Sequence, residues 1–279
     1  MQDSEPANAP VSPTGEGAGG NGHLASPAPP TGTLLPGALF QGFAPAVRRK
    51  LVVGDHADDG NGIAVAIEQF RRLAATLHHA QVEREIRAVL ITSAIAGEGK
   101  TLTASNLALT LSESYRRNVL LIDADLRRPG LHEIFQVPNT SGLREGLRED
   151  GDPRLALLEI TPRLMLVPAG RADPDPMSVL CSSNMRRIIE EASARFDWVI
   201  LDAPPVGLIT DASLLAKMVD TTLIVIQAGK TDYPIVRRAV DAVGRDRVFG
   251  IVLNRIAVPE TPYGYRYRNY YATYRASSK

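Results

Sequence analysis

Cysteine, aromatic residues and long apolar runs are all scarce in this sequence of 279 residues. Cys181 is the only cysteine, which excludes an internal disulfide or a cysteine-based zinc site and is typical of a reducing compartment. We expect Cys181 to be a small buried residue. No apolar run approaches the roughly 18 residues that a membrane-spanning helix needs, and the N-terminus lacks the basic-then-apolar order of a secretion signal. These absences predict a cytoplasmic protein.

Net charge is also absent, because 31 lysine and arginine residues balance 31 aspartate and glutamate residues. Such a chain has no overall attraction toward nucleic acid or an anionic membrane, so any charged function must be local. We therefore expect no nucleic-acid partner. A hydrophobic content of 44% is enough for a substantial core.

Composition divides the chain into three parts. Residues 1–46 are dominated by Pro, Gly, Ala, Ser and Thr, and we expect them to form a disordered tail to which no function is assigned. Residues 47–258 carry the apolar patterns of one folded domain. Residues 259–279 form a second tail, rich in tyrosine, which we also expect to be disordered.

Apolar periodicity within residues 47–258 predicts an α/β fold. Apolar residues recur at helical spacing from Ile63 to Leu77, which predicts an amphipathic helix that ends near His78 and His79. Short apolar runs without alternation follow, as expected of strands that helices cover on both faces. These runs are residues 88–92, 119–122, 164–167, 198–201, 222–226 and 248–253. The arrangement predicts a mostly parallel β-sheet between helical layers.

The segment SAIAGEGKT has the strand, glycine loop and helix order of a phosphate-binding loop, or P-loop. Gly97 and Gly99 allow backbone N–H groups to surround phosphate oxygens, and the following helix adds its positive end. Lys100 is expected to reach the β and γ phosphates, and the Thr101 hydroxyl to bind Mg²⁺. Ala94 replaces the usual first glycine. The loop residues predicted to bind ATP are Ala96, Gly97, Glu98, Gly99, Lys100, Thr101 and Leu102.

Aspartates follow two of the predicted strands at the point where each strand ends. Asp123 and Asp125 follow VLLI, and Asp202 follows WVIL. Each aspartate alone could be a helix cap or a turn residue. The carboxyl ends of parallel strands meet at one edge of the sheet, however, and phosphoryl transfer needs Mg²⁺, ligands for it and a proton acceptor. Together with the P-loop, these carboxylates predict a site for MgATP chemistry.

The segments AIAGEGKT, LLIDADLRRP and VILDAPP resemble the Walker A, Walker A′ and Walker B motifs of the bacterial tyrosine kinases, which regulate capsule and exopolysaccharide production. The resemblance continues through LVPAG, the PDP segment, PPVGLITDA and GIVLNR, and thus covers most of residues 62–258. It implies a P-loop NTPase fold and an ATP-dependent protein-tyrosine kinase that regulates exopolysaccharide or capsule synthesis or export.

The resemblance implies a role for each motif residue. Thr101, Asp125 and Asp202 would hold the metal ion, with the aspartates acting through water. Asp123 would accept the proton of the tyrosine hydroxyl, whose pKa near 10 in model peptides makes it a poor nucleophile at neutral pH. Asn254 would contact adenine. The catalytic group would be Lys100, Asp123, Asp125 and Asp202, and the division of roles between Asp123 and Asp125 is a hypothesis.

Most of the tyrosines lie in the segment PYGYRYRNYYATYR, and only Tyr115 and Tyr233 lie elsewhere. Interspersed arginines favour a mobile segment over a packed strand, and they also suit single-stranded nucleic acid, although no groove accompanies them. The resemblance implies phosphorylation of the tail in trans by neighbouring subunits, and release of the tail as each phosphate adds about 1.5 to 2 negative charges. The predicted acceptors are Tyr263, Tyr265, Tyr267, Tyr270, Tyr271 and Tyr274.

The pattern departs from the family in the helix motif E-x-x-R-x-x-R, which joins subunits into a ring. Glu68 and Arg71 are present, but Ala74 replaces the second arginine, so that self-association is less firmly indicated than nucleotide binding; Glu68 and Arg71 could simply form a solvated helix face. The resemblance further implies a membrane-embedded polysaccharide co-polymerase as activator, a tyrosine phosphatase as a second partner, and recruitment to the inner face of the membrane.

Two alternatives remain. One is a deviant Walker ATPase of the partition or positioning type, which uses ATP as a dimerisation switch. Such proteins have a second lysine early in the P-loop, where this chain has Ile95. The other is a nucleotide-binding regulator that presents its tail as a docking peptide without catalysis. The intact catalytic group argues against it, namely Lys100, Asp123, Asp125 and Asp202.

Overall fold

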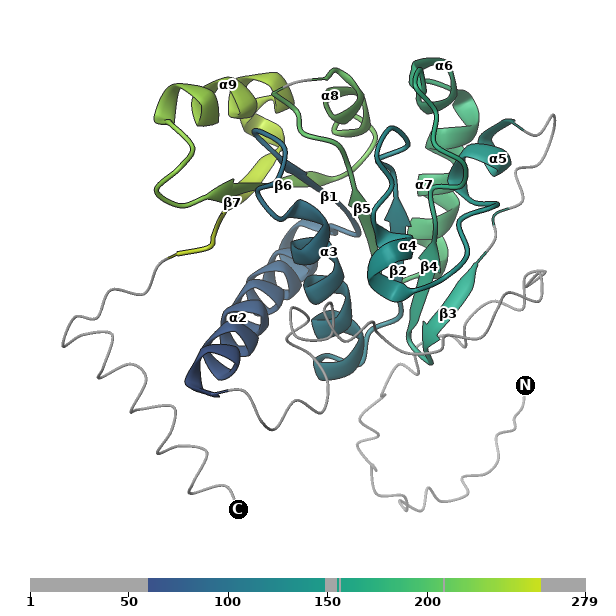
Figure 1. Ribbon diagram of the computed structural model, residues 1–279. Helices are drawn as coiled ribbons and strands as arrows, with labels where there is room; N and C mark the ends of the chain where they lie inside the picture. The colour runs from purple at the N-terminus through teal and green to yellow at the C-terminus, as the bar shows by residue number, and fades with distance from the viewer. Residues whose placement is uncertain (1–59, 149–154, 156, 208, 257–279) are drawn as a thin grey trace, which may run out of the picture.

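The computed structural model describes residues 60–148, 155, 157–207 and 209–256. The predicted tail of residues 1–46 and the tyrosine cluster within residues 259–279 lie outside the described residues. At the centre is a seven-stranded sheet with the strand order β3-β4-β2-β5-β1-β6-β7 (Figure 1). Its strands are β1 (Ala88–Ser93), β2 (Val119–Asp123), β3 (Leu158–Thr161), β4 (Leu164–Val167), β5 (Trp198–Asp202), β6 (Thr221–Gln227) and β7 (Val248–Asn254).

All strands predicted from the sequence are present, each to within one residue at either end. In the sheet order β4-β2-β5-β1-β6-β7, every pair of adjacent strands is parallel, which confirms the mostly parallel sheet. β3 was not predicted, and it pairs antiparallel with β4 at the edge of the sheet. Its sequence LEIT has only four residues and exposes Glu159, so it lacks the continuous apolar run of the interior strands.

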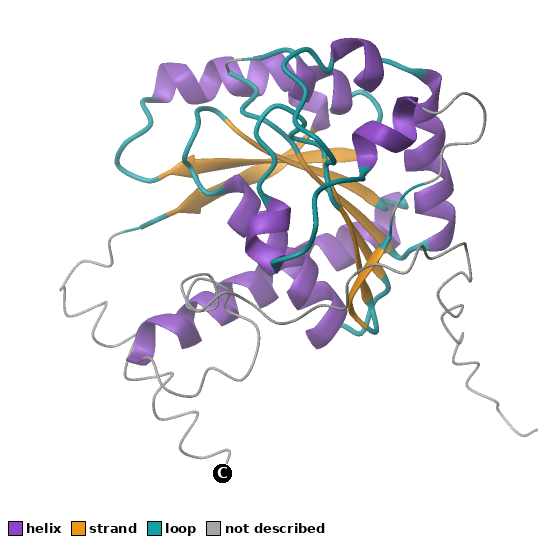
Figure 2. Cartoon of the chain, turned by 45° about the vertical axis from the view of Figure 1, so that its right-hand side comes forward, coloured by secondary structure: helices purple, strands orange, loops and turns teal. Residues whose placement is uncertain are grey.

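Helices cover both faces of the sheet (Figure 2). Alternate residues along β1 enter different cores: Val89 and Ile91 pack with α2, α3 and α4, whereas Leu90 packs with α7, α8 and α9. Two-sided burial explains why the strands read as unbroken apolar runs. The helices are α2 (Gly60–Arg84), α3 (Lys100–Leu109), η1 (Thr110–Ser114), α4 (Leu131–Phe135), α5 (Leu143–Arg148), α6 (Met177–Leu180), α7 (Ser183–Arg195), α8 (Asp211–Leu215), α9 (Tyr233–Val243) and η2 (Arg245–Arg247).

Two local predictions were wrong. α2 continues past His79 to Arg84, because Ala80 extends the buried stripe and the Gln81 side chain donates hydrogen bonds to the carbonyls of Ile86 and Asp197. Cys181 is exposed, because it caps the C-terminus of the short helix α6 instead of entering the core. Within the described ranges, no helix has the length and hydrophobicity needed to cross a membrane.

Candidate active site

The P-loop joins the end of β1 to the start of α3. Gly97 and Gly99 adopt positive φ angles of 84° and 94°, a region that side chains with a Cβ rarely occupy. Gly99 is the N-cap of α3, and no side chain accepts a hydrogen bond from the first turn there. The free N–H groups of this turn, together with the helix dipole, make the loop suited to an anion.

Strand register brings the predicted carboxylates to the same edge of the sheet. Asp202 at the end of β5 is level with Ile91 on β1 and with Asp123 on β2. The chain beyond each strand continues this contact: the Ala124 N–H donates to the Asp202 carbonyl at 2.8 Å, and the Ala203 N–H to the Ile91 carbonyl at 2.9 Å. The three loops that follow β1, β2 and β5 are thereby held side by side.

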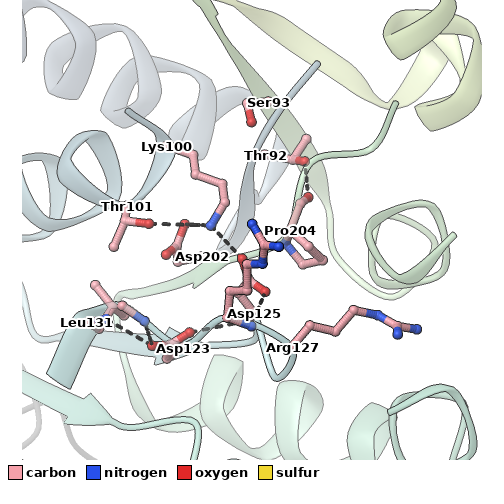
Figure 3. Close-up of polar contacts among 12 residues, drawn as sticks. Thr92, Ser93, Lys100, Thr101, Asp123, Asp125, Arg127, Leu131, Asp202 and Pro204 are labelled. Carbon is pink, nitrogen blue, oxygen red and sulfur yellow. Dashed lines mark hydrogen bonds and ion pairs between the residues drawn. The ribbon is translucent and has the colours of Figure 1, made fainter. Parts of the chain in front are cut away.

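Lys100 points from the start of α3 into this group of acidic side chains (Figure 3). Its Nζ lies 2.8 Å from Asp125 Oδ2, 3.6 Å from Asp202 Oδ1 and 3.3 Å from the Thr101 hydroxyl. Burial alone lowers the pKa of Lys100, but the carboxylates of Asp202, Asp125 and Asp123 outweigh burial and raise that pKa above its ordinary value. Lys100 is therefore positively charged at neutral pH.

Asp202 is fully buried, and within the described residues neither of its oxygens accepts a hydrogen bond of ordinary length and angle, while Lys100 Nζ lies 3.6 Å from Oδ1. Burial raises the pKa of its carboxyl, although Lys100 opposes the increase. Buried oxygens without hydrogen bonds, beside a second carboxylate and a hydroxyl, match the oxygen ligands that Mg²⁺ prefers. The described residues contain no group of three His, Cys, Asp or Glu side chains arranged to hold a metal by themselves. Phosphate and water oxygens would have to complete the shell of a Mg²⁺ ion here.

Asp123 is buried beneath the loop that follows β2. Its Oδ2 accepts hydrogen bonds from the N–H groups of Gly130 and Leu131, at 3.0 and 2.9 Å, and its Oδ1 accepts one from the Asp125 N–H at 3.2 Å. Burial, followed by the neighbouring charge of Asp202, raises the pKa of Asp123 to about 7. The side chain thus fixes the 124–131 loop, and its pKa lies close to neutral pH.

The structure places Asn254 against the P-loop. Its Nδ2 donates to the Glu98 carbonyl at 2.8 Å, and a Cβ added to Gly99 would lie 2.2 Å from that nitrogen. Gly99 is thus required both by its φ angle and by this contact. The adenine contact inferred for Asn254 stays a prediction. The tips of the loop, Ala96 and Gly97, are exposed, while Leu102 packs partly against the α2–α3 core.

Two further polar contacts, which were not predicted from the sequence, fix the segments that follow β2 and β5. Arg127 donates through Nε and Nη2 to both carboxylate oxygens of Asp211, which is nearly fully buried at the start of α8, and through Nη1 to the Pro174 carbonyl. The Thr92 hydroxyl donates to the Pro204 carbonyl at 2.7 Å. Arg127 and Asp211 lie in motifs quoted above, RRP and ITDA, but their pairing depends on loop positions that the sequence does not reveal.

This loop, its lysine and the neighbouring carboxylates define a P-loop nucleotide-binding protein. Residues 87–246 match the family model described as Cellulose biosynthesis protein BcsQ. Tyrosine-protein kinase YwqD of Bacillus subtilis is 35% identical over 202 residues, which are 71% of this chain and 85% of that protein. Tyrosine-protein kinase wzc of Salmonella typhi is 32% identical over 224 residues, or 79% of this chain and 31% of that protein.

Solved structures agree with the sequence comparison. The kinase domain of Escherichia coli tyrosine kinase ETK matches with a TM-score of 0.65 at 31% identity, covering 76% of this chain and 83% of the solved one. The chain belongs to the bacterial tyrosine kinase family. The BcsQ match ends at residue 246, before β7 and the tyrosine cluster, so it concerns the nucleotide-binding core.

Proposed function

We propose that this chain is an ATP-dependent protein-tyrosine autokinase that phosphorylates its own C-terminal tyrosine cluster and thereby regulates exopolysaccharide or capsule synthesis or export. The observation that carries the proposal is the position of Lys100 between Asp125 and Asp202 at the mouth of the P-loop, in a chain of the tyrosine kinase family. The description of the matching family model, which concerns the biosynthesis of cellulose, supports the link to polysaccharides.

The residues around Lys100 suit the parts of a phosphoryl transfer. The P-loop N–H groups would bind the phosphates of ATP, and Lys100 would neutralise charge on the β and γ phosphates. Thr101, Asp125 and Asp202 would hold Mg²⁺, which supplies charge neutralisation on the phosphates when bound. Because Lys100 pairs with both aspartates, its contact with phosphate requires these carboxylates to take another cation as partner.

We assign the proton-acceptor role to Asp123, whose pKa of about 7 is matched to a transfer at neutral pH. Asp125 is the alternative, because its Oδ1 accepts only the Arg128 N–H, whereas Asp123 accepts three N–H groups. The variants Asp123→Asn and Asp125→Asn separate the two roles. The variant that lacks the proton acceptor retains Mg²⁺-dependent ATP binding and loses transfer, and the variant that lacks a metal ligand loses both.

The acceptor residues are proposed to be the tail tyrosines, reached in trans from a neighbouring subunit. The two tyrosines outside the tail are held within the folded domain. The Tyr115 hydroxyl donates to the Arg71 carbonyl at 3.0 Å, and Tyr233 is the first residue of helix α9. Repeated phosphorylation would turn the basic tail acidic and repel it from the carboxylates of the site. A variant with every tail tyrosine replaced by phenylalanine should then remain assembled in the presence of MgATP, which size-exclusion chromatography measures.

The ring motif E-x-x-R-x-x-R is incomplete in α2, so self-association would depend on other residues of this helix. Glu68 pairs with Arg72 at 3.6 Å, and Ala74 is fully buried in the core that α2 shares with α3. Position 74 is therefore not part of the exposed face. In the relative wzc the matching region is joined to a longer chain. We propose that a separate membrane-embedded polysaccharide co-polymerase activates this chain at the inner membrane face, and that a tyrosine phosphatase reverses the reaction.

One experiment tests the proposal. The purified chain is incubated with MgATP, and phosphate is mapped by mass spectrometry beside Lys100→Met and the matched control Lys217→Met, which alters an exposed lysine. Phosphotyrosine within residues 259–279 that is lost in Lys100→Met and kept in Lys217→Met supports the autokinase. ATP hydrolysis without phosphotyrosine would instead indicate the dimerisation-switch ATPase, and would refute the proposal.

A further inference from the structure

Glu98 is an acidic side chain that lies inside the P-loop and is only 1% exposed. Its carboxylate accepts three hydrogen bonds: Oε2 from the Ile95 N–H at 2.8 Å, and Oε1 from the Gln227 N–H at 3.0 Å and from the Thr231 hydroxyl. No cationic side chain in the described ranges forms an ion pair with it. A buried carboxylate is costly unless hydrogen bonds replace its hydration, and these three donors do so.

These hydrogen bonds connect the P-loop to two other parts of the fold. Gln227 ends β6, and Thr231 lies in the connection that leads to α9. The backbone of Glu98 is held as well, because its carbonyl accepts from Asn254 Nδ2 at the end of β7. The Asn254 carbonyl in turn accepts the Ala228 N–H at 2.9 Å. Side chain and backbone of Glu98 are therefore fixed to the same corner of the sheet.

The neighbours of Glu98 make this attachment necessary. Gly97 and Gly99 have positive φ angles, and a Cβ added to Gly97 would meet no atom within 4 Å. Glycines in open surroundings permit many backbone conformations, and ordering them costs entropy. Gly97 is such a residue, and the Glu98 side chain beside it supplies the contacts that select one conformation. The Ile95 contact closes the loop on itself, and the contacts with Gln227 and Thr231 fix its direction.

We propose that Glu98 is a positioning residue, which holds the P-loop in its phosphate-binding conformation by accepting hydrogen bonds from Ile95, Gln227 and Thr231. The inference deepens the proposed function and rests on its nucleotide site, because Glu98 acts on ATP only through the loop backbone. If the loop adopts the binding conformation only part of the time, the apparent dissociation constant rises in inverse proportion to that fraction.

Replacing Glu98 by glutamine tests the geometry with little change of size. The glutamine amide retains one acceptor oxygen, but its NH₂ group replaces the other. That NH₂ group would face an N–H or O–H donor of the loop, so the hydrogen bonds to one of the two carboxylate oxygens are lost. We expect the dissociation constant for ADP and the KM for ATP to rise about tenfold, while kcat at saturating ATP changes less than about twofold. Glu98→Ala should weaken binding further.

The closing experiment measures ADP binding by calorimetry, KM and kcat by phosphotyrosine formation, and thermal unfolding, on the full chain. The matched control is Glu113→Gln, which makes the same chemical change at an exposed position after α3. Weaker ADP binding by Glu98→Gln, with wild-type affinity in Glu113→Gln, supports the inference. Wild-type ADP affinity in Glu98→Gln overturns it, and so does a loss of kcat without a change in affinity.

Thr231→Val and Thr231→Ser keep the inference testable if the Glu98 variants fail to fold. Valine removes one hydrogen bond at nearly constant shape and should weaken ADP binding about two- to threefold, whereas serine should restore it. Equal affinity in the valine variant and the wild type would then contradict the inference. ADP binding is measured without phosphoryl transfer, so a chain that binds ADP through Glu98 but forms no phosphotyrosine would refute the proposed function alone.

Discussion

Asp123→Asn is expected to stabilise the fold at high pH while it abolishes phosphoryl transfer. The carboxyl of Asp123 is buried, and its pKa is raised from 3.8 to about 7. The folded state therefore binds a proton that the unfolded state releases between about pH 4 and pH 7. The contribution of this group to stability is fully present below pH 4 and is lost as pH rises through 7. Asparagine carries no charge and escapes this penalty.

The magnitude follows from the difference in pKa. A shift of about 3 units corresponds to about 4 kcal/mol at high pH, and to under half of that near pH 5. The asparagine oxygen is able to accept the Gly130 and Leu131 N–H groups, but the weaker bond from the Asp125 N–H is lost, which costs about 1 kcal/mol. The net gain at about pH 8 is thus about 3 kcal/mol, or roughly 6 to 12 °C in melting temperature.

Paired melting curves of the wild type and Asp123→Asn across this pH range measure the effect. The advantage of the variant should be about 2 to 3 kcal/mol larger near pH 8 than near pH 5. Parallel pH profiles would refute the reasoning, because they would show that Asp123 has an ordinary pKa in the folded state. A variant that gains stability and also keeps full phosphoryl transfer would refute the proton-acceptor role instead.

Further predictions concern residues around the site and the surface. Arg127→Ala leaves the buried Asp211 without its cation and hydrogen-bond donors and should cost about 1 to 3 kcal/mol in the free energy of unfolding, which chemical denaturation measures. Thr92→Val should cost about 1 to 2 kcal/mol, because the Pro204 carbonyl loses its buried donor, while ADP affinity stays unchanged in calorimetry. Ala74→Arg should lower the melting temperature without promoting assembly in light scattering, because position 74 lies in the core; assembly by this variant would contradict the placement.

Several features of the fold follow from local sequence. The strands other than β3 were predictable to within one residue, because burial on both faces leaves unbroken apolar runs that are visible in the local sequence. The P-loop was predictable because its glycines and lysine are adjacent in the chain. The convergence of Asp123 and Asp202 also followed, since carboxyl ends of parallel strands share an edge, and the register of β2 and β5 confirms it.

Other features depend on residues that are distant in the chain. The edge strand β3 and the extension of α2 to Arg84 depend on contacts with β4 and with the loops after α2 and α7, which leave no periodic signal. The attachment of Glu98 to Thr231 spans 133 positions. The sequence by itself determined the parallel strands, the P-loop and the family resemblance, because each of these depends on residues that are adjacent in the chain. Only the tertiary structure decided which buried carboxylate meets which donor, because hydrogen bonding depends on distances that folding alone brings about.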